Sequence, residues 1–163
     1  MSRFSCWHCL LLCLLSAAPA LARAEGLLTS FYCVVQAVES GNAFSCVRYR
    51  QLPDSEEVEQ SRVRVSLLAF QPPPDNHPLA AASYTQLDNI LLYQQVRVDV
   101  FGVDKVGRDL ARVRLYKADI TAALLSRGLG SVDRSQYGAY YYVPFEREAR
   151  NEGLGIWAQS DPL

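Results

Sequence analysis

The segment from Arg62 to Pro74, RVRVSLLAFQPPP, constrains the fold more than any other stretch of the chain. Val63, Val65 and Leu67 recur at every second position, so they share one face of an extended segment. The other face carries Arg62, Arg64, Ser66 and Leu68. Three consecutive prolines then end the strand, because proline has no N–H for a ladder and forces a loop. The pattern predicts a strand with one core face and, directly after it, a loop of the kind that often carries a functional site.

The first 24 residues have the pattern of a secretory signal peptide. A basic residue lies in a short head, an apolar run covers Leu10–Leu15, and small residues follow. The run is shorter than the roughly 20 residues that a membrane span needs. Two A-x-A patterns predict cleavage after Ala22 or Ala24. We therefore expect a signal peptide over 1–24, a single domain over 25–163, and a periplasmic or secreted protein without membrane attachment.

The charge balance excludes a generic polyanion-binding protein. The chain has 16 Lys and Arg against 17 Asp and Glu. Loss of Arg3 and Arg23 with the signal peptide, and of no acidic residue, leaves 14 against 17, a net charge of -3. Affinity for phosphate must then come from locally clustered arginines rather than from the overall field of the protein.

Two cysteines remain after removal of the signal peptide, Cys33 and Cys46, and they lie in segments typical of strands, 31–38 and 43–50. The turn Ser40-Gly41-Asn42 joins these segments into a predicted hairpin in which the two cysteines lie almost opposite each other. Export places them in an oxidising compartment. A disulfide is one outcome. Two small core residues that never meet are the other, since a slip of one residue places them on opposite faces.

The remainder of the chain predicts helices and two further strands. The predicted elements are helices over 79–92, 120–127 and 145–151 and strands over 96–101 and 110–116. Asp119 is suited to cap the second helix and Gly128 to end it. Three strands, a helix, two strands and two helices form the order of a five-stranded Greek-key barrel of the OB-fold type, a mainly β fold with about three helices.

Four tyrosines lie in the predicted loop before the third helix: Tyr137, Tyr140, Tyr141 and Tyr142. Exposed tyrosines can form a platform on which nucleic-acid bases stack. Loop aromatics that cover the end of a small barrel explain the same residues without any ligand. Both interpretations remain open from the sequence.

Five motifs together resemble the staphylococcal thermonuclease family, in that order and spacing. They are VVQAVESGNAF, VRVSLLAFQPP, DKVGRDLARVRLY, AALLSRGLGSV and EARNEGLGIW, and they extend over about Tyr32 to Ala158. The resemblance implies the same five-stranded barrel with helices that the order of elements predicts. It does not by itself imply the family's activity.

The resemblance implies a phosphodiesterase chemistry that uses Ca²⁺, carboxylates and two arginines. The two arginines correspond to Arg64 and Arg108 of this chain. The positions of three carboxylates correspond to Asn42, Ala69 and Pro72, which carry no charge. Ca²⁺ takes roughly six to eight oxygen ligands and needs anionic ones for tight binding. We therefore expect no metal cofactor.

The hypothesis that we favour from the sequence is a catalytically degenerate thermonuclease-like domain, and hence a protein that is not an enzyme. Its arginine pair, Arg64 and Arg108, then weakly binds nucleic acid or a nucleotide. Arg112 and Arg114 lie on the same face of a predicted strand and extend the cationic patch.

Two alternatives stay open. One is an active, Ca²⁺-dependent endonuclease whose metal site is rebuilt from Asp75, His77 or Glu39. The other is a protein-interaction module that keeps the barrel and pairs its arginines with acidic side chains. The carboxylates available for such pairs are Asp99, Asp104 and Asp109.

Overall fold

The computed structural model describes residues 26–158, so the predicted signal peptide lies outside the described residues. The long strands are β1 (Thr29–Ser40), β2 (Ala43–Gln51), β3 (Val58–Leu67), β5 (Gln95–Val103) and β6 (Asp109–Leu115). The helices are α1 (Ala80–Leu91), α2 (Ile120–Leu125) and α3 (Val143–Asn151). Shorter elements are β4 (Phe70–Gln71), β7 (Ala118–Asp119), β8 (Ser131–Val132) and the 3₁₀-helices η1 (Ala139–Tyr141) and η2 (Gly155–Trp157). None of the helices in this described range has the length and apolar character needed to cross a membrane.

The long strands form a closed barrel. Their order is β3-β2-β1-β5-β6, with β7 added beside β6, and all of these neighbours are antiparallel. The barrel closes where Val65–Leu67 of β3 pair in parallel with Asp109–Ala111 of β6. The predicted five-stranded barrel with three helices is confirmed.

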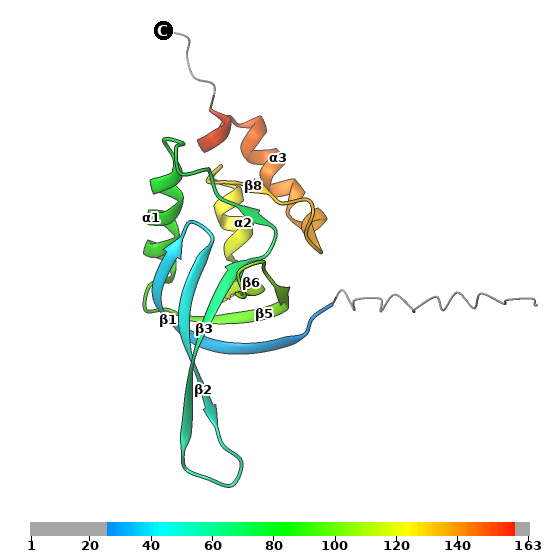
Figure 1. The fold of residues 1–163 in the computed structure, drawn as a ribbon. Helices are drawn as coiled ribbons and strands as arrows, with labels where there is room; N and C mark the ends of the chain where they lie inside the picture. Colours follow the sequence, from blue (N-terminus) through cyan, green and yellow to red (C-terminus); the bar gives the residue numbers. More distant parts are fainter. Residues whose placement is uncertain (1–25, 159–163) are drawn as a thin grey trace, which may run out of the picture.

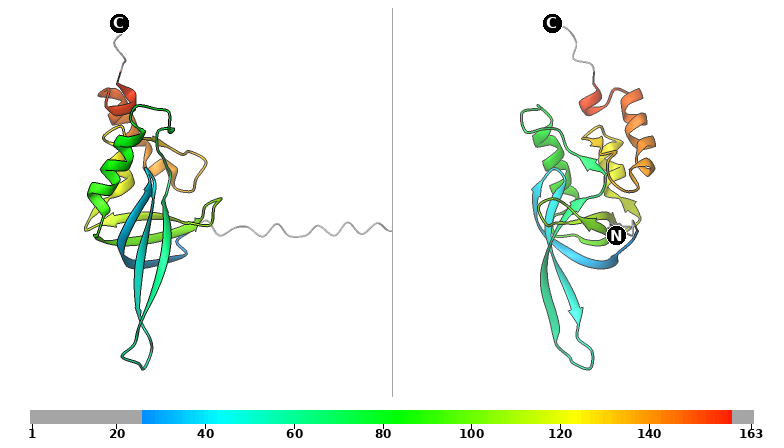
Figure 2. Two further views of the ribbon diagram at one scale, coloured as in Figure 1. Left: turned by 60° about the vertical axis from the view of Figure 1, so that its left-hand side comes forward. Right: turned by 45° about the vertical axis from the view of Figure 1, so that its right-hand side comes forward.

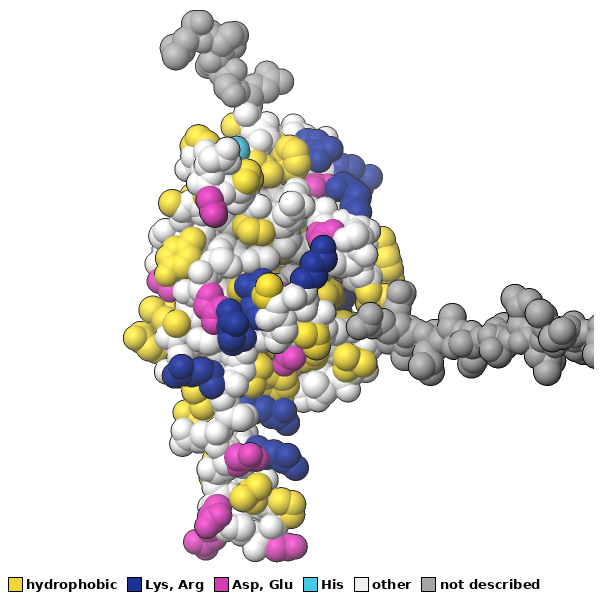
Figure 3. Space-filling view, viewed as in Figure 1, with side chains coloured by type: hydrophobic (Ala, Val, Ile, Leu, Met, Phe, Trp, Pro, Cys, Tyr) yellow, Lys and Arg dark blue, Asp and Glu magenta, His cyan; other side chains and the backbone are white. Residues whose placement is uncertain are grey.

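The helices and the longest hairpin lie at opposite ends of the barrel. Figure 1 and both views of Figure 2 show α1, α2 and α3 grouped on one side, while the β2–β3 hairpin extends away from the other side as an arm. The arm forms because β6 pairs with only the last three residues of β3. Acidic side chains gather at its free end, and basic ones lie nearer the barrel (Figure 3).

The core follows from the alternation in the strands. Val65 and Leu67 of β3 are fully buried, and the same side of the sheet is buried in β1 and β5. The contributing residues there are Phe31, Cys33, Val35, Val96, Val98 and Val100. Leu87 and Leu91 of α1 close the barrel end. Burial of each such aliphatic side chain stabilises the fold by about 1.5–3 kcal/mol.

Cys33 and Cys46 are joined by a disulfide that links β1 to β2. They lie almost opposite each other, as predicted: in the ladder Cys33 pairs with Arg48 and Cys46 with Val35. Both side chains face the core, and their Cα atoms are 5.7 Å apart, a spacing that a disulfide spans. Of the two outcomes left open by the sequence, the disulfide is the one present.

The predicted helices are present with shifted ends: α2 ends at Leu125 rather than at 127, and α3 begins at Val143 rather than at 145. Asp119 caps α2 by accepting a hydrogen bond from the Ala122 N–H at 3.1 Å. Gly128 follows α2 with a φ of +66°, and a Cβ there would lie 2.1 Å from the Leu154 carbonyl oxygen. Only glycine fits that position. The first helix begins at Ala80 and is therefore slightly shorter than predicted.

Candidate functional site

A cleft of about 400 Å³ lies where the β1–β2 turn, the β5–β6 turn and the segment after β8 meet. Its lining residues are Asn42, Ser66, Val103, Asp104, Lys105, Val106, Arg108, Leu110, Asp133, Ser135 and Gln136. The cleft thus combines two basic residues with two acidic ones. Two of the predicted site residues, Asn42 and Arg108, come together in it.

The β5–β6 turn positions Arg108. Asp104 folds this turn by accepting hydrogen bonds from the N–H groups of Val106 and Arg108 at 3.0 and 2.9 Å. Its other carboxylate oxygen accepts a bond from Arg108 Nε at 2.7 Å. Burial pushes the pKa of Asp104 upward, but the bonds from Arg108 and Val106 outweigh this effect and hold the pKa below its usual value. The Arg108 side chain is therefore held by the turn from which it projects.

Arg64 projects from β3 at the base of the arm and pairs with Glu39 of β1. Its Nε lies 3.1 Å from both Glu39 oxygens, and its Nη2 lies 2.7 Å from Oε2. The hydrogen bonds and charge of Arg64 lower the pKa of Glu39, and the charge of Arg108 lowers it further. The Arg64 side chain is 53% exposed, so this pair is open to solvent.

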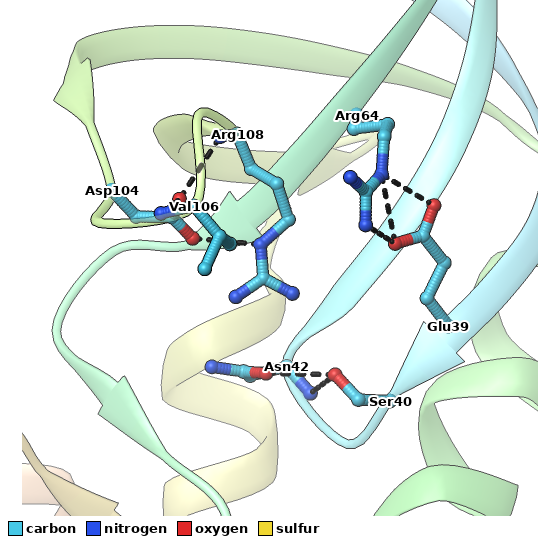
Figure 4. A network of polar contacts seen from close by, with 7 residues as sticks. All are labelled: Glu39, Ser40, Asn42, Arg64, Asp104, Val106 and Arg108. Atoms are coloured by element: carbon cyan, nitrogen blue, oxygen red, sulfur yellow. Dashed lines mark hydrogen bonds and ion pairs between the residues drawn. The ribbon is translucent and has the colours of Figure 1, made fainter.

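Arg64 and Arg108 lie on the same side of the molecule, but each binds a different carboxylate. Figure 4 shows the Arg108–Asp104 and Arg64–Glu39 pairs on either side of the β1–β2 turn, with Asn42 near the end of the Arg108 side chain. Arg108 lines the cleft, whereas Arg64 does not. The charge of Asp104 raises the pKa of Arg64 after the contributions of Glu39, so the two pairs interact electrostatically.

At the three positions where the resemblance to the thermonuclease family implies carboxylates, the side chains of this chain have one oxygen or none. The Asn42 side-chain oxygen accepts a hydrogen bond from Ser40 Oγ at 2.9 Å. Ala69 is fully buried, and its backbone N–H donates to the Gln136 side-chain oxygen at 2.6 Å. Pro72 lies beside the β1–β2 turn and lines a separate hollow. Gln136 therefore takes up the space beside Ala69.

These residues do not fit a Ca²⁺ ion. They offer a single neutral amide oxygen, which Ser40 already occupies, whereas a tight site needs several anionic oxygens. Asp133 also lines the cleft, but its two carboxylate oxygens already accept hydrogen bonds from Ser135 and Gln136. Over residues 26–158, no three His, Cys, Asp or Glu side chains form a group that could hold a metal ion.

The residues considered for a rebuilt metal site do not converge on the cleft. Glu39 is paired with Arg64. His77 accepts a hydrogen bond from the Leu79 N–H through Nδ1 at 3.1 Å, which helps to start α1. Asp75 and Glu39 line the hollow that contains Pro72, away from Arg108.

Arg112 lies outside the cleft, in a cluster that joins the barrel to the C-terminal helices. Its Nε donates to the Tyr142 hydroxyl at 3.3 Å, and its guanidinium lies 4.9 Å from the Tyr141 ring centre. Tyr142 is fully buried and donates to Asp119 at 3.0 Å. Burial raises the pKa of Tyr142 well above its usual value. Of the predicted tyrosine loop, Tyr142 is therefore a core residue, whereas Tyr140 and Tyr141 are exposed.

Arg114 lies on the outer face of β6 and pairs with Asp99 of β5 together with Arg97. Of the three carboxylates considered as partners, Asp104 binds Arg108 and Asp99 binds Arg114, while Arg64 pairs with Glu39 instead. Arg97 was not among the residues predicted from the sequence. Its alternation with Val96 and Val98 places it on the outer face and could have identified it.

Comparison with known proteins identifies relatives of this chain. A family model described as staphylococcal nuclease homologue matches residues 38–159. An uncharacterized endonuclease of Haemophilus influenzae is 23% identical over 101 residues, covering 62% of this chain and 57% of that protein. A probable endonuclease of Uncinocarpus reesii is 26% identical over 128 residues, covering 66% of this chain and 42% of that protein. An uncharacterized 38.1 kDa protein of Capnoides sempervirens is 25% identical over 120 residues, covering 70% of this chain and 34% of that protein. The chain thus spans about a third to just over half of the length of these relatives.

Proposed function

The chain belongs to the staphylococcal nuclease family, and from this premise we propose that it is an exported, catalytically degenerate member that binds phosphate groups through Arg64 and Arg108. Its ligand is a nucleic acid or a nucleotide, held weakly. The observation that carries the proposal is the contrast between the retained arginines and the three uncharged residues, Asn42, Ala69 and Pro72, at the positions of the carboxylates.

The ion pairs of the two arginines support weak binding. Arginine stays charged in proteins, and its planar fork matches two oxygens of a phosphate. Exposed ion pairs such as Arg64–Glu39 contribute little to stability, so a phosphate can compete with the carboxylate. The side chain of Arg108 uses only Nε to bind Asp104, which leaves its terminal NH₂ groups for a ligand.

Asn42 adds a donor at the same place. Its side-chain oxygen accepts from Ser40 Oγ, so its NH₂ group remains to donate a hydrogen bond into the cleft. An aspartate there repels a phosphate unless a cation lies between them, whereas the asparagine amide binds it directly. The substitution therefore favours phosphate binding without metal and disfavours the metal-dependent chemistry.

The absence of turnover follows, in this proposal, from the residues that surround the arginines. Cleavage of a phosphodiester requires a positioned water and stabilisation of the charge that develops on the phosphate. Arg64 and Arg108 can supply part of that stabilisation. Ala69 and Pro72 can neither orient a water nor hold a cation, so a bound phosphodiester remains intact.

Export is supported by the Cys33–Cys46 disulfide, because such bonds persist in oxidising compartments. We expect thiol counting on the denatured, natively produced protein to find neither cysteine free. Two free thiols would contradict export.

Binding is tested by isothermal titration with a nucleoside bisphosphate at low salt. We expect the parent to bind and the Arg64→Ala, Arg108→Ala double variant to lose binding. Arg62→Ala, Arg147→Ala is the matched control, because it removes the same charge from exposed positions away from the cleft. Equal binding by the parent and the Arg64, Arg108 variant overturns the proposal, as does the absence of binding by the parent.

Catalysis is tested by incubating single-stranded DNA with the protein, with and without millimolar Ca²⁺. We expect no cleavage under either condition. Metal-dependent cleavage that disappears in Asp75→Ala or His77→Ala would instead establish an active endonuclease with a rebuilt metal site.

A further inference from the structure

A further hollow, of about 330 Å³ and distinct from the cleft and from the hollow that contains Pro72, lies on the outer face of β1, β5 and β6. Its lining residues are Tyr32, Gln94, Gln95, Arg97, Arg114 and Tyr116, which we call the Tyr–Arg hollow. Tyr32 pairs across the ladder with Arg97, and Arg97 with Arg114, so the three side chains form one row. Arg114 is five residues along β6 from the cleft end of the strand, which is about 17 Å at 3.3 Å per residue. The hollow is therefore separate from the cleft.

The Tyr–Arg hollow carries an uncompensated positive charge. Arg97 Nε and Arg114 Nη2 both donate to Asp99, which also accepts from Ser30 Oγ at 2.6 Å. Two guanidinium groups thus share one carboxylate. Asp99 is only 5% exposed, whereas the two arginines are 42% and 35% exposed. The buried carboxylate fixes both arginines in place, and both side chains remain partly exposed to solvent.

Tyr116 does not contribute to the stability of the fold. It lies in the β6–β7 turn with a φ of +54°, a conformation in which glycine or asparagine is favoured. Its side chain is 89% exposed and gains almost no burial in return. Tyr32 is also largely exposed, at the other end of the row. Two solvated rings flank two solvated guanidinium groups.

We propose that the Tyr–Arg hollow is a second binding site, for single-stranded nucleic acid. Arg97 and Arg114 bind a phosphate of the backbone, and a base stacks on Tyr116 or Tyr32, the combination of contacts that single-strand-binding surfaces use. An acidic peptide would satisfy the arginines but offers the exposed rings no flat partner. The ligand class is shared with the function proposed for the cleft, but the residues are different.

The test is fluorescence anisotropy with a labelled oligothymidylate of about 12 nucleotides at low salt. The Arg64→Ala, Arg108→Ala background removes the two arginines of the function proposed above, and we expect binding to persist there. In this background we expect Tyr116→Asn to weaken binding about tenfold, because a stacking ring is lost. Tyr93→Asn is the matched control, since Tyr93 also has a positive φ, is 71% exposed and does not line the hollow.

The arginines are tested by the salt dependence of binding. Loss of one phosphate contact to a single strand lowers the slope of log affinity against log salt by about 0.7, and we expect this change in Arg97→Gln. Thermal melting checks that each variant is folded. Asp99 keeps its bonds to Ser30 and Arg114 in Arg97→Gln, which favours a folded protein.

The outcomes separate this inference from the function proposed for the cleft. No oligothymidylate binding in the Arg64→Ala, Arg108→Ala background overturns the second site, even if the parent binds through the cleft. Equal weakening by Tyr116→Asn and Tyr93→Asn also overturns it. Displacement of the oligonucleotide by polyglutamate of equal charge and concentration shows that only charge is recognised, and it favours an acidic protein partner instead. Unchanged bisphosphate binding by the cleft variant overturns the cleft function alone.

Discussion

Two pairs of arginines on this barrel differ in how many carboxylates hold them. Arg108, which lines the cleft, and Arg64, which lies outside it, each have an acidic partner of their own, and these pairs are formed within or beside turns. On the outer face, Arg97 and Arg114 share Asp99 alone. The Arg64 and Arg108 pairs are thus neutral, while the outer pair retains one positive charge.

The difference also concerns burial of the carboxylate. Asp99 is almost inaccessible, whereas Glu39 is 27% exposed. A buried carboxylate that loses its partners is costly, because water cannot replace them. An exposed pair breaks at little cost. Asp99 therefore supports the fold and the orientation of its arginines, while Glu39 mainly competes with ligands for Arg64.

The largest expected effect is on stability, in a comparison of Asp99→Asn with Glu39→Gln. Asp99→Asn removes the charge from a buried acceptor of three hydrogen bonds and leaves two guanidinium groups without a counterion. We expect it to lower the free energy of unfolding by about 2–3 kcal/mol. Glu39→Gln should lower it by less than about 1 kcal/mol. Urea denaturation of both variants measures the difference, and equal losses would contradict the distinction drawn from burial.

A second prediction concerns Arg112, which belongs to neither pair. It is bound by the Tyr142 hydroxyl and lies over the rings of Tyr141 and Phe101. We expect Arg112→Gln to destabilise the protein by about 2 kcal/mol, since one hydrogen bond, the cation–π contacts and the ion pair with Asp119 at 3.6 Å are lost. Oligonucleotide binding per folded molecule should not change. Weaker binding with unchanged stability would make Arg112 a ligand-binding residue, as its position in the sequence suggested.

The sequence predicted the barrel because apolar residues alternate along its strands. In β3 the alternation placed Val65 and Leu67 in the core correctly, but Ser66 and Leu68 of the predicted opposite face are buried too. The strand ends at Leu67, before the proline run that was predicted to end it. What alternation cannot show is how far the neighbouring strands extend. Pairing with β6 stops short of Val63, so the first part of β3 forms an exposed arm that the pattern does not distinguish from a strand of the barrel.

The arginine sites were less predictable, because partners come from other strands. Arg64 and Arg108 were identified through motifs, but the partner of Arg64 depends on the register between β1 and β3, two strands that are joined only through β2. Gln136 is 67 residues from Ala69, whose N–H it binds. No local sequence pattern reveals that a side chain so far along the chain binds the backbone of Ala69. Tyr142 likewise differs from Tyr141 only through packing.

A third prediction concerns a variant with carboxylates at the three uncharged positions Asn42, Ala69 and Pro72. The parent should show no rise in melting temperature with millimolar Ca²⁺. Asn42→Asp, Ala69→Asp, Pro72→Glu should gain about 1.4 kcal/mol of stability when Ca²⁺ exceeds its Kd tenfold, because only the folded state has the site. Thermal melting with Ca²⁺ and Mg²⁺ measures this gain. A shift of several degrees in the parent would contradict the proposed loss of the metal site.

The smallest expected effect is on the pH dependence of binding in the cleft. The pKa values of Glu39 and Asp104 lie below their usual values. At Glu39 the hydrogen bonds from Arg64 outweigh burial, and at Asp104 burial raises the pKa but the hydrogen bonds from Arg108 and Val106 outweigh it. A carboxyl group with a lowered pKa stabilises the fold above its unfolded-state pKa, and this contribution disappears as pH falls through the folded-state value. The same protonation removes the competitor for each arginine. Affinity for oligothymidylate, whose phosphodiesters stay ionised, should therefore rise as pH falls through that range.

The variant Glu39→Gln tests this competition directly. It should bind oligothymidylate about threefold more tightly than the parent at pH 7, since it removes one exposed competing pair. Its affinity should also rise less at low pH. Anisotropy titrations over the pH range in which the protein remains folded provide the measurement. If Glu39→Gln and the parent bind equally at pH 7, Glu39 does not compete for Arg64, and the contrast between the two arginine pairs lies in burial alone.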